Sequence, residues 1–301
     1  MSEQPLHDAR GQVVVGVDDS TESAEAAAWA ADEASRRRTG LMLVSAYSVP
    51  HRGLLAYDVM SEDYAGVLRT QQQDLHRRIA SGLLERHPEL PITSAVETGH
   101  PVDVLLGRSA GAALLVVSTR ERGRFRRLIG GSVAIGLAGH SPVPLAVIRP
   151  GAAQPRSGPI VVGVDGSAAS QPAVALAYQE ASLRGAELVA LHAWHDDLTV
   201  EVDERGLIGA DIDEASLRQI EQALVSEELA GYAQTYPDVV VRPVVRKGDP
   251  ITELLELSAD AAMVIVGSRG RGGFKGSVLG STGQALIAHA DAPVVVVRPL
   301  D

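Results

Sequence analysis

The 301-residue sequence contains no cysteine, only 3 % aromatic residues and no apolar run that approaches the length of a membrane-spanning helix. The absence of cysteine excludes disulfides, thiolate metal sites and cysteine nucleophiles. So few aromatic residues argue against a stacking platform for single-stranded nucleic acid. Apolar runs such as residues 112–117 stop far short of the roughly 18 residues that a membrane helix needs, and the first dozen residues are polar. We therefore expect a soluble, cytoplasmic protein without a membrane partner.

Positive charge is also scarce. Lys and Arg number 27 against 38 Asp and Glu, which gives a formal net charge of −11. This excess of negative charge repels the phosphates of nucleic acids, so general nucleic-acid binding is not expected. Hydrophobic residues make up 45 % of the chain, which fits a globular core, and the length predicts about two domains.

Two similar halves make up the chain. Residues 13–20 (VVVGVDDS) reappear at 160–167 as IVVGVDGS, and a Gly-Ser pair and a final Pro-rich strand segment recur further on at a nearly constant offset. A repeat of about 150 residues is too long for a solenoid unit and indicates a duplicated domain. The Pro/Gly-rich segment 150–158 separates the copies. We predict domains at residues 1–150 and 158–301.

Within each half, short β-branched runs alternate with longer amphipathic segments, which is typical of βαβ units. The strands are expected at residues 13–17, 41–46, 92–97, 113–118 and 145–148, and again at 160–164, 188–193, 239–246, 262–267 and 294–297. Because these strands are almost continuously apolar, helices should cover both faces of each sheet. The predicted fold is α/β, with two repeated, doubly wound, five-stranded parallel-sheet domains of Rossmann-like type.

Helix boundaries follow from capping residues and prolines. Long helices are expected at residues 62–86 and 213–236, each ending next to a proline. Short helices should begin at Pro101 and Pro250, where a missing N–H group is harmless. The Asp-x-Ser segment after the first strand of each half is expected to cap the helix that follows.

A glycine-rich, basic segment follows the fourth strand of the second half. Residues 267–282 (GSRGRGGFKGSVLGST) lead into a helix. Glycines let a backbone approach a ligand closely, and a helix N-terminus presents N–H groups to anions. Ligands of open parallel sheets bind beyond the carboxyl ends of the strands. The segment therefore predicts a phosphate site, and the alternative is a surface loop with solvated charges.

Gly267, Gly270 and the pair Gly280-Ser281 form the pattern Gly-x2-Gly-x9-Gly-Ser. The sequence resembles the universal stress protein family in this pattern and in its position after the fourth strand. Three further segments carry the same resemblance: the VGVDGS start of the second half, residues 191–193 (LHA) and the PVVVVRP segment near its end. The resemblance covers essentially the whole chain and suggests a tandem, ATP-binding member. It implies the adenine nucleotide alpha hydrolase-like version of the predicted fold.

The resemblance further implies that the second half binds ATP, with a divalent ion such as Mg²⁺ or Mn²⁺ on the triphosphate. Asp165 matches an acidic residue near the adenosine, where its carboxylate suits hydroxyl or amine donors better than phosphates; a helix-capping role is the alternative. The implied contacts are Asp165, Ala193, Gly248, Gly267, Arg269, Gly270, Gly280, Ser281 and Thr282. Gly248 has the alternative role of a plain turn between strand and helix.

The first half departs from this pattern. Ser118 and Glu121 stand where the second half has Gly267 and Gly270. A side chain hinders close approach and a carboxylate repels phosphates, so nucleotide affinity should be weaker there. Five arginines between residues 120 and 127 either hold phosphates by charge or form a solvated face. The weaker candidates for a first site are Asp18, Ser48, Gly131, Ser132 and Val133.

Enzyme motifs are missing: the sequence has no Gly-x4-Gly-Lys-Ser/Thr loop, no Gly-x-Gly-x-x-Gly turn after the first strand and no Gly-x-Ser-x-Gly elbow. We assign no catalytic residue and no protein-bound metal. The functional prediction is an ATP-binding, regulatory stress-response protein with an unidentified protein partner. Its two halves are expected to pair through their fifth strands as a pseudo-dimer, and a homodimer of whole chains is left open. The alternatives are a partner-binding stress protein without nucleotide and a slow ATP hydrolase.

Overall fold

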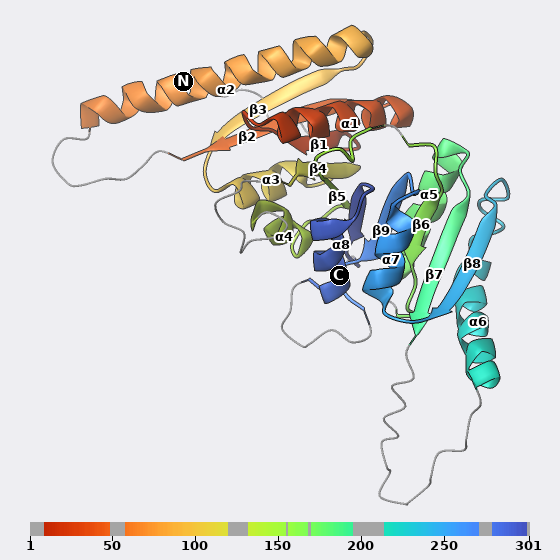
Figure 1. Cartoon of the computed structure of the whole chain (residues 1–301). Coiled ribbons are helices and arrows are strands. Elements are labelled where there is room, and N and C mark those ends of the chain that lie inside the picture. The colour runs from red at the N-terminus through yellow and green to blue at the C-terminus, as the bar shows by residue number, and fades with distance from the viewer. Residues whose placement is uncertain are drawn as a thin grey trace, which may run out of the picture.

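The computed structural model describes residues 9–48, 58–119, 132–154, 156–167, 170–194, 214–270 and 279–299. Both halves repeat one order of elements (Figure 1). The first half contains β1 (Val13–Gly16), α1 (Thr21–Arg37), β2 (Leu41–Tyr47), α2 (Asp58–Arg86), β3 (Ile92–Thr98), α3 (Pro101–Ser109), β4 (Leu114–Ser118), α4 (Ser132–Ala138) and β5 (Leu145–Ile148). The second half contains β6 (Ile160–Gly163), α5 (Gln171–Arg184), β7 (Leu188–Trp194), α6 (Glu214–Ala230), β8 (Val241–Lys247), α7 (Pro250–Ser258), β9 (Met263–Gly267), α8 (Ser281–His289) and β10 (Val294–Val297).

All ten strands form one sheet in the order β3-β2-β1-β4-β5-β10-β9-β6-β7-β8. Neighbouring strands are parallel within each half. The halves meet where β5 and β10 pair antiparallel, with Ala146 opposite Val295. Each fifth strand thus covers the unpaired edge of the other. The structure confirms the α/β fold and the pairing through the fifth strands.

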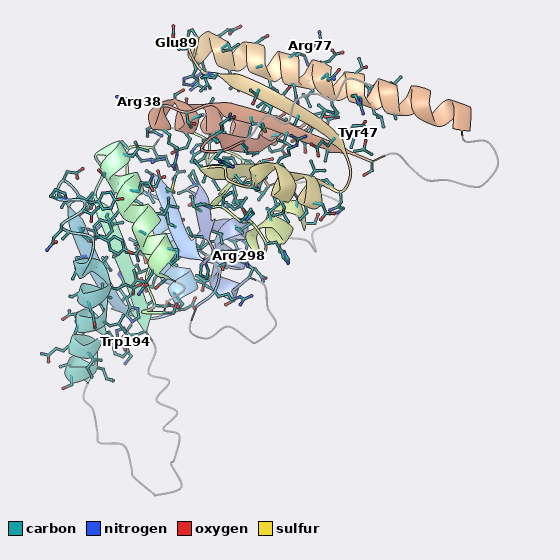
Figure 2. The ribbon with its side chains drawn as sticks, turned by 180° about the vertical axis from the view of Figure 1, so that it is seen from behind. Arg38, Tyr47, Arg77, Glu89, Trp194 and Arg298 are labelled. Carbon is teal, nitrogen blue, oxygen red and sulfur yellow. The ribbon has the colours of Figure 1, made fainter. Side chains whose placement is uncertain are left out.

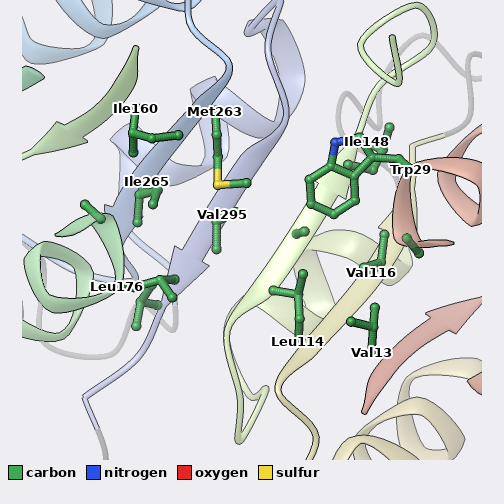
Figure 3. Packing of buried hydrophobic residues seen from close by; sticks show 14 of the residues in the cluster. Val13, Trp29, Leu114, Val116, Ile148, Ile160, Leu176, Met263, Ile265 and Val295 are labelled. Carbon is green, nitrogen blue, oxygen red and sulfur yellow. The ribbon is translucent and has the colours of Figure 1, made fainter. Parts of the chain in front are cut away.

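Helices cover both faces of this sheet, because side chains of a strand alternate between its faces. Val13 and Val15 point into the core beneath α1, α2, α5 and α6, whereas Val14 points into the core beneath α3, α4, α7 and α8. Figure 2 shows the molecule from behind, with α5 in front of the sheet. Figure 3 shows the first core near the junction, where Met263 and Val295 of the second half and Ile148 of the first lie in one cluster. Each core therefore runs through both halves.

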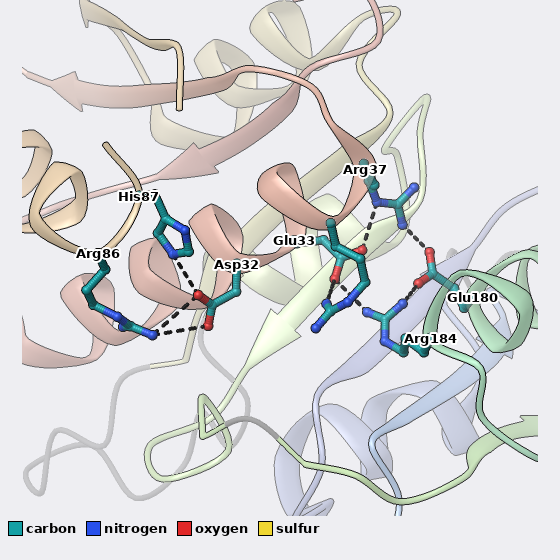
Figure 4. A network of polar contacts seen from close by, with 8 residues as sticks. Asp32, Glu33, Arg37, Arg86, His87, Glu180 and Arg184 are labelled. Atoms are coloured by element: carbon teal, nitrogen blue, oxygen red, sulfur yellow. Dashed lines mark hydrogen bonds and ion pairs between the residues drawn. The ribbon is translucent and has the colours of Figure 1, made fainter. Parts of the chain in front are cut away.

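A buried ion network joins α1 to α5 across the pseudo-twofold axis (Figure 4). Glu33 accepts hydrogen bonds from Arg36 (3.1 Å), Arg37 (2.8 Å) and Arg184 (2.5 Å). Glu180 accepts from Arg37 and Arg184. Both carboxylates are almost completely buried, with exposed fractions of 0 % and 1 %. Burial in the core is tolerated because each carboxylate meets at least two guanidinium groups.

One helix of the second half is shorter than the sequence predicts. α6 ends at Ala230, six residues before the expected boundary, and the chain continues in turns through Thr235. Gly231 follows the last helical residue, and glycine is a weak helix former. Beyond it, the rings of Tyr232 and Tyr236 stack on Tyr178 of α5, with centroids 5.0 and 5.8 Å apart. Packing onto α5 replaces the last turns of the helix.

The capping prediction holds in the first half and is wrong in the second. Ser20 caps α1, since its Oγ accepts from the Ser23 N–H at 3.2 Å. In the second half, α5 begins only at Gln171, so Ser167 does not cap it. Ser167 Oγ donates to Asp165 Oδ1 at 2.6 Å, as Ser20 Oγ does to Asp18 Oδ1 in the first half. The Asx turn therefore forms in both copies, but only in the first does its serine also stand at the N-cap of the following helix.

The end of the linker requires a glycine. A Cβ atom added to Gly158 would stand 1.7 Å from the carbonyl oxygen of Asp260, a clash with backbone that no rotamer relieves. None of the helices within the described ranges is both long and apolar enough to cross a bilayer.

A buried histidine of α2 ties this helix to β2. Ser45 Oγ donates to the Val17 carbonyl oxygen at 2.7 Å and lies 2.7 Å from His76 Nε2. Since the hydroxyl has only one proton, Nε2 donates to Ser45 and Nδ1 remains an acceptor. Nδ1 is buried and finds no hydrogen-bond partner among the described residues. Burial lowers the pKa of His76 to about 4, because the protonated ring would bury an unpaired charge.

We expect His76 to make the free energy of unfolding depend on pH. Its ordinary pKa is 6.5, so between pH 6.5 and about 4 the unfolded chain binds a proton that the folded chain does not. The free energy of unfolding should therefore fall as the pH falls through this window, by about 3 kcal/mol at most. Urea unfolding at pH 7 and pH 4.5 measures the change. His76→Met should show a shallower dependence, and an equal slope in both proteins would contradict the assignment.

Candidate functional site

A cavity of about 720 Å³ opens at the carboxyl ends of β6 and β9. These strands are neighbours in the sheet, and from them the chain winds outward in opposite directions, to β7 and to β10. Such a reversal of strand order is where open α/β sheets bind ligands. We call this the β6/β9 cavity; its lining includes Asp165, Leu191, His192, Ala193, Trp194, Glu221, Asp249, Leu254, Gly267, Arg269, Gly270, Leu279, Gly280, Ser281, Thr282 and Gln284.

The structure brings eight of the nine predicted nucleotide contacts into this lining: Asp165, Ala193, Gly267, Arg269, Gly270, Gly280, Ser281 and Thr282. Gly248 is the exception. It forms the turn between β8 and α7, where its N–H donates to the Trp194 carbonyl oxygen at 2.9 Å. Its neighbours Asp249 and Pro250 line the cavity instead. Spacing alone brings Gly248 to this edge of the sheet but does not decide which residue of the turn faces the cavity.

One end of the cavity is suited to anions. α8 begins at Ser281 with Gly280 as its N-cap, and no side chain caps it. Among the described residues, no side chain accepts from the first N–H groups of the helix, and the helix dipole favours negative charge there. Arg269, which is exposed, adds a positive charge to the lining. A Cβ atom on Gly270 would lie 2.8 Å from Asp165 Oδ2, so this glycine leaves room that a side chain would fill.

Asp165 is held in a fixed orientation at the end of β6. Its Oδ1 accepts from the Ser167 N–H at 3.0 Å and from Ser167 Oγ at 2.6 Å. The side chain is half-buried and lines the cavity. A carboxylate in such a turn is an acceptor for hydroxyl or amine donors and repels phosphate oxygens.

Two further polar residues of the lining come from positions that sequence reasoning left without a role. His192 lies on β7, and its Nδ1 is 2.7 Å from the Val164 carbonyl oxygen while its Nε2 is 2.8 Å from Glu221 Oε2. Both partners are hydrogen-bond acceptors, so the ring ties β7 to the end of β6 and to α6. Ser45 and His76 make the corresponding tie in the first half. Glu221 comes from α6, and no motif in the sequence links it to β7.

Trp194, the last residue of β7, was also missed. Its ring is 7 % exposed and lines the cavity, and Lys247 Nζ lies 5.7 Å from the ring centroid. The buried indole Nε1 has no acceptor among the described residues. A buried donor without a partner is uncommon in folded proteins and is consistent with a ligand that accepts from it. An aromatic residue directly after Ala193 was the available signal.

The candidates for a site in the first half occupy the matching edge of the sheet. Asp18 Oδ1 accepts from the Ser20 N–H at 2.9 Å, Ser48 Oγ donates to the Gly99 carbonyl oxygen at 3.4 Å, and Ser132 begins α4. Val133 follows in α4, whereas Gly131 and the arginine-rich segment lie in residues 120–131, outside the described part of the chain. Within the described part, no group of three or more His, Asp or Glu side chains is placed to hold a metal ion.

Comparison with known proteins agrees with this architecture. The family model "Universal stress protein family" matches residues 10–149 and 157–298. The chain is 36 % identical over 296 residues to universal stress protein Rv2623 of Mycobacterium tuberculosis H37Rv and 37 % identical over 296 residues to Rv2005c of the same strain; each alignment covers 95 % of this chain and 96 % of the relative.

A crystal structure of a universal stress protein from Archaeoglobus fulgidus DSM 4304 superposes with a TM-score of 0.69 at 18 % identity, covering 97 % of this chain and 99 % of that one. At this identity the likeness concerns the fold alone. The family matches, which span both halves, decide the assignment. The chain belongs to the universal stress protein family and carries two domains of that family in tandem.

Proposed function

We propose that the β6/β9 cavity binds ATP, and that its occupancy makes this chain a regulatory stress protein rather than a committed enzyme. The observation that supports this most strongly is the convergence of Asp165, the glycines of the Gly-x2-Gly-x9-Gly-Ser pattern and the uncapped start of α8 on one cavity. Its volume of about 720 Å³ suits a small-molecule ligand.

The two ends of the cavity fit the two ends of a nucleotide. Phosphates suit the backbone at Gly267 and Gly270, the first N–H groups of α8 and the charge of Arg269. Ribose hydroxyls suit Asp165. The adenine edge suits the backbone at Ala193, beside the indole N–H of Trp194, which finds no acceptor in the described part of the chain. A Mg²⁺ or Mn²⁺ ion would be held mainly by the triphosphate, with the hydroxyls of Ser281 and Thr282 as oxygen donors.

The lining offers little for hydrolysis. Of its carboxylates, Asp165 accepts from Ser167, Glu221 accepts from His192, and Asp249 Oδ2 caps α7 by accepting from the Thr252 N–H at 3.0 Å. Each of these carboxylates is already oriented by a neighbouring donor, and the sequence carries no motif of a nucleotide-hydrolysing enzyme. Binding that is read by a partner protein therefore explains the site better than rapid turnover does. The proposal includes an unidentified protein partner, and it leaves a homodimer of whole chains open.

Calorimetric titration of the purified chain with ATP and Mg²⁺ tests the proposal. We expect about one site per chain, in the second half, because the first half lacks two of the three motif glycines. Two sites would mean that the arginines of residues 120–127 replace those glycines. A chain that binds no ATP, and that carries no nucleotide when purified, would overturn the proposal in favour of partner binding without nucleotide.

A further inference from the structure

A second cavity, of about 520 Å³, lies at the opposite edge of the sheet in the first half. It is lined by the end of α1 and by the segment that leads into β3: Ser35, Arg38, Thr39, Gly40, His87, Pro88, Glu89, Leu90 and Pro91. We call it the α1/β3 cavity. Figure 2 labels Arg38 and Glu89 at this end of the molecule. The cavity shares no residue with the β6/β9 cavity.

Three side chains form a hydrogen-bonded series that ends in this cavity. Asp32 Oδ1 lies 2.8 Å from His87 Nε2, and His87 Nδ1 lies 3.1 Å from Ser35 Oγ. Ser35 and His87 line the cavity, and Asp32 stands behind the imidazole, where Arg86 also donates to it at 3.3 Å (Figure 4). The side chains of His87 and Asp32 are 19 % and 22 % exposed. The imidazole and the carboxylate are therefore largely shielded from water, whereas Ser35 lines the cavity.

The chemistry of these partners determines where the proton lies in the neutral ring. An ionised carboxylate only accepts hydrogen bonds, so Asp32 holds the proton of His87 on Nε2. Nδ1 is then unprotonated and accepts from the Ser35 hydroxyl. This order of carboxylate, imidazole and hydroxyl activates a serine as a nucleophile, and it is recognised by geometry and not by position in the chain.

An arginine with an unusual backbone conformation stands at the rim of this cavity. Arg38 follows α1 in the left-handed region, with φ of 54° and ψ of 44°. The second half has Gly185 at this position, with φ of 59° and ψ of 35°. In both halves this conformation is the C-cap of a helix, a position that favours glycine. The first half keeps a guanidinium at the rim of the cavity although its backbone favours glycine.

The second half lacks this series, because two of its three positions differ. Gln179 and Tyr236 occupy the places of Asp32 and His87, at repeat offsets of 147 and 149. Ser182 keeps its hydroxyl, but its Oγ donates directly to Asp238 Oδ2 at 2.8 Å, with no imidazole between them. This copy is thus a natural control within the same chain.

We propose that Ser35, His87 and Asp32 form an acyl-transfer site that takes small, uncharged carboxylic esters. Ser35 is the nucleophile, His87 the general base, and Asp32 a positioning residue. Pro88, Leu90 and Pro91 offer an apolar wall for the acyl group. Arg38 brings positive charge for the oxyanion, and Glu89 at the same cavity disfavours anionic esters.

The reaction balances with water as the only co-substrate. The Ser35 oxygen adds to the ester carbonyl carbon while its proton passes to His87 Nδ1. The carbon–oxygen bond to the alcohol breaks, and the alcohol leaves with that proton. Water then adds to the acyl-serine, His87 takes its proton and returns it to Ser35, and the carboxylic acid leaves.

Acylation of the full-length chain by p-nitrophenyl acetate tests this proposal, with peptide mass spectrometry to locate the adduct. We expect acetyl-Ser35 together with released p-nitrophenol. Ser35→Ala should abolish this adduct, and His87→Gln should slow its formation by about a hundredfold. Ser182→Ala, the matched control in the second half, should leave it unchanged.

Asp32→Asn distinguishes a role of Asp32 in positioning the His87 ring from a role in stabilising the fold. It should slow acylation and also shift the ¹⁵N resonances of the His87 ring toward the other tautomer, while the melting temperature reports folding. Should His87→Gln fail to fold, the rate and spectrum of Asp32→Asn decide the question. The proposal is overturned when no adduct forms on Ser35, or when folded His87→Gln or Asp32→Asn acylates at the rate of the unmodified chain.

Discussion

Gly270→Glu is expected to reduce the affinity for ATP by about a hundredfold or more, which corresponds to about 3 kcal/mol. The variant copies the first half, where Glu121 stands at this position. Even its Cβ atom would lie only 2.8 Å from Asp165 Oδ2, so the new side chain displaces Asp165 or enters the cavity. Its carboxylate then repels both Asp165 and the phosphates at short range. Titration calorimetry measures the loss.

Two variants separate these effects. Gly270→Ala adds the Cβ without the charge and should lose less affinity than Gly270→Glu. Gly82→Glu adds the same charge at an exposed position of α2, where nothing lies within 4 Å of a Cβ, and should bind ATP normally. Unchanged affinity in Gly270→Glu would show that ATP binds elsewhere in the chain.

Arg184→Met is expected to cost about 3–5 kcal/mol in the free energy of unfolding. Arg184 donates to both Glu33 and Glu180, and its side chain is only 11 % exposed. Removing it leaves two nearly fully buried carboxylates that share fewer cations, and neither is able to move into water without separating α1 from α5. Urea unfolding at pH 8 measures the cost.

Arg77→Met is the matched control. Arg77 pairs with Asp74 on α2, but these side chains are 76 % and 45 % exposed, so the loss should stay below about 1 kcal/mol. If both variants lost a similar amount of unfolding free energy, burial would not be the reason why the Arg184 contacts matter.

The penalty of Arg184→Met should also depend on pH. Burial, and then the neighbouring Glu33, raise the pKa of Glu180 above its ordinary value of 4.5, while Arg184 and Arg37 oppose the rise. A raised pKa in the folded state means that stability is highest at low pH and is lost as the pH rises through that pKa. Without Arg184 the pKa rises further, so the destabilisation should be smaller at pH 5 than at pH 8.

The two halves have diverged at opposite edges of one fold. The second half keeps the glycine pattern at the carboxyl ends of its strands, where the first half has Ser118 and Glu121. The first half has Asp32 and His87 near the amino ends of its strands, where the second has Gln179 and Tyr236. Duplication allows this, because each copy supplies half of the continuous sheet and cores while its ligand edge is free to change.

The sequence by itself determined the duplication, the order of strands and helices, and the segment that lines the β6/β9 cavity. These features rest on local rules: apolar periodicity sets strands and helices, prolines mark helix starts, and parallel strands bring their carboxyl ends to one edge. The glycine pattern was found for the same reason, since its residues lie close together in the chain.

Only the tertiary structure decided which distant side chains meet. Glu221 reaches His192 from another element, and Glu33 and Arg184 lie in different halves. The early end of α6 has the same origin, because the tyrosines beyond Gly231 gain more from stacking on Tyr178 than from further helical turns. Such contacts depend on where packing places whole elements, and no spacing within a single segment encodes that placement.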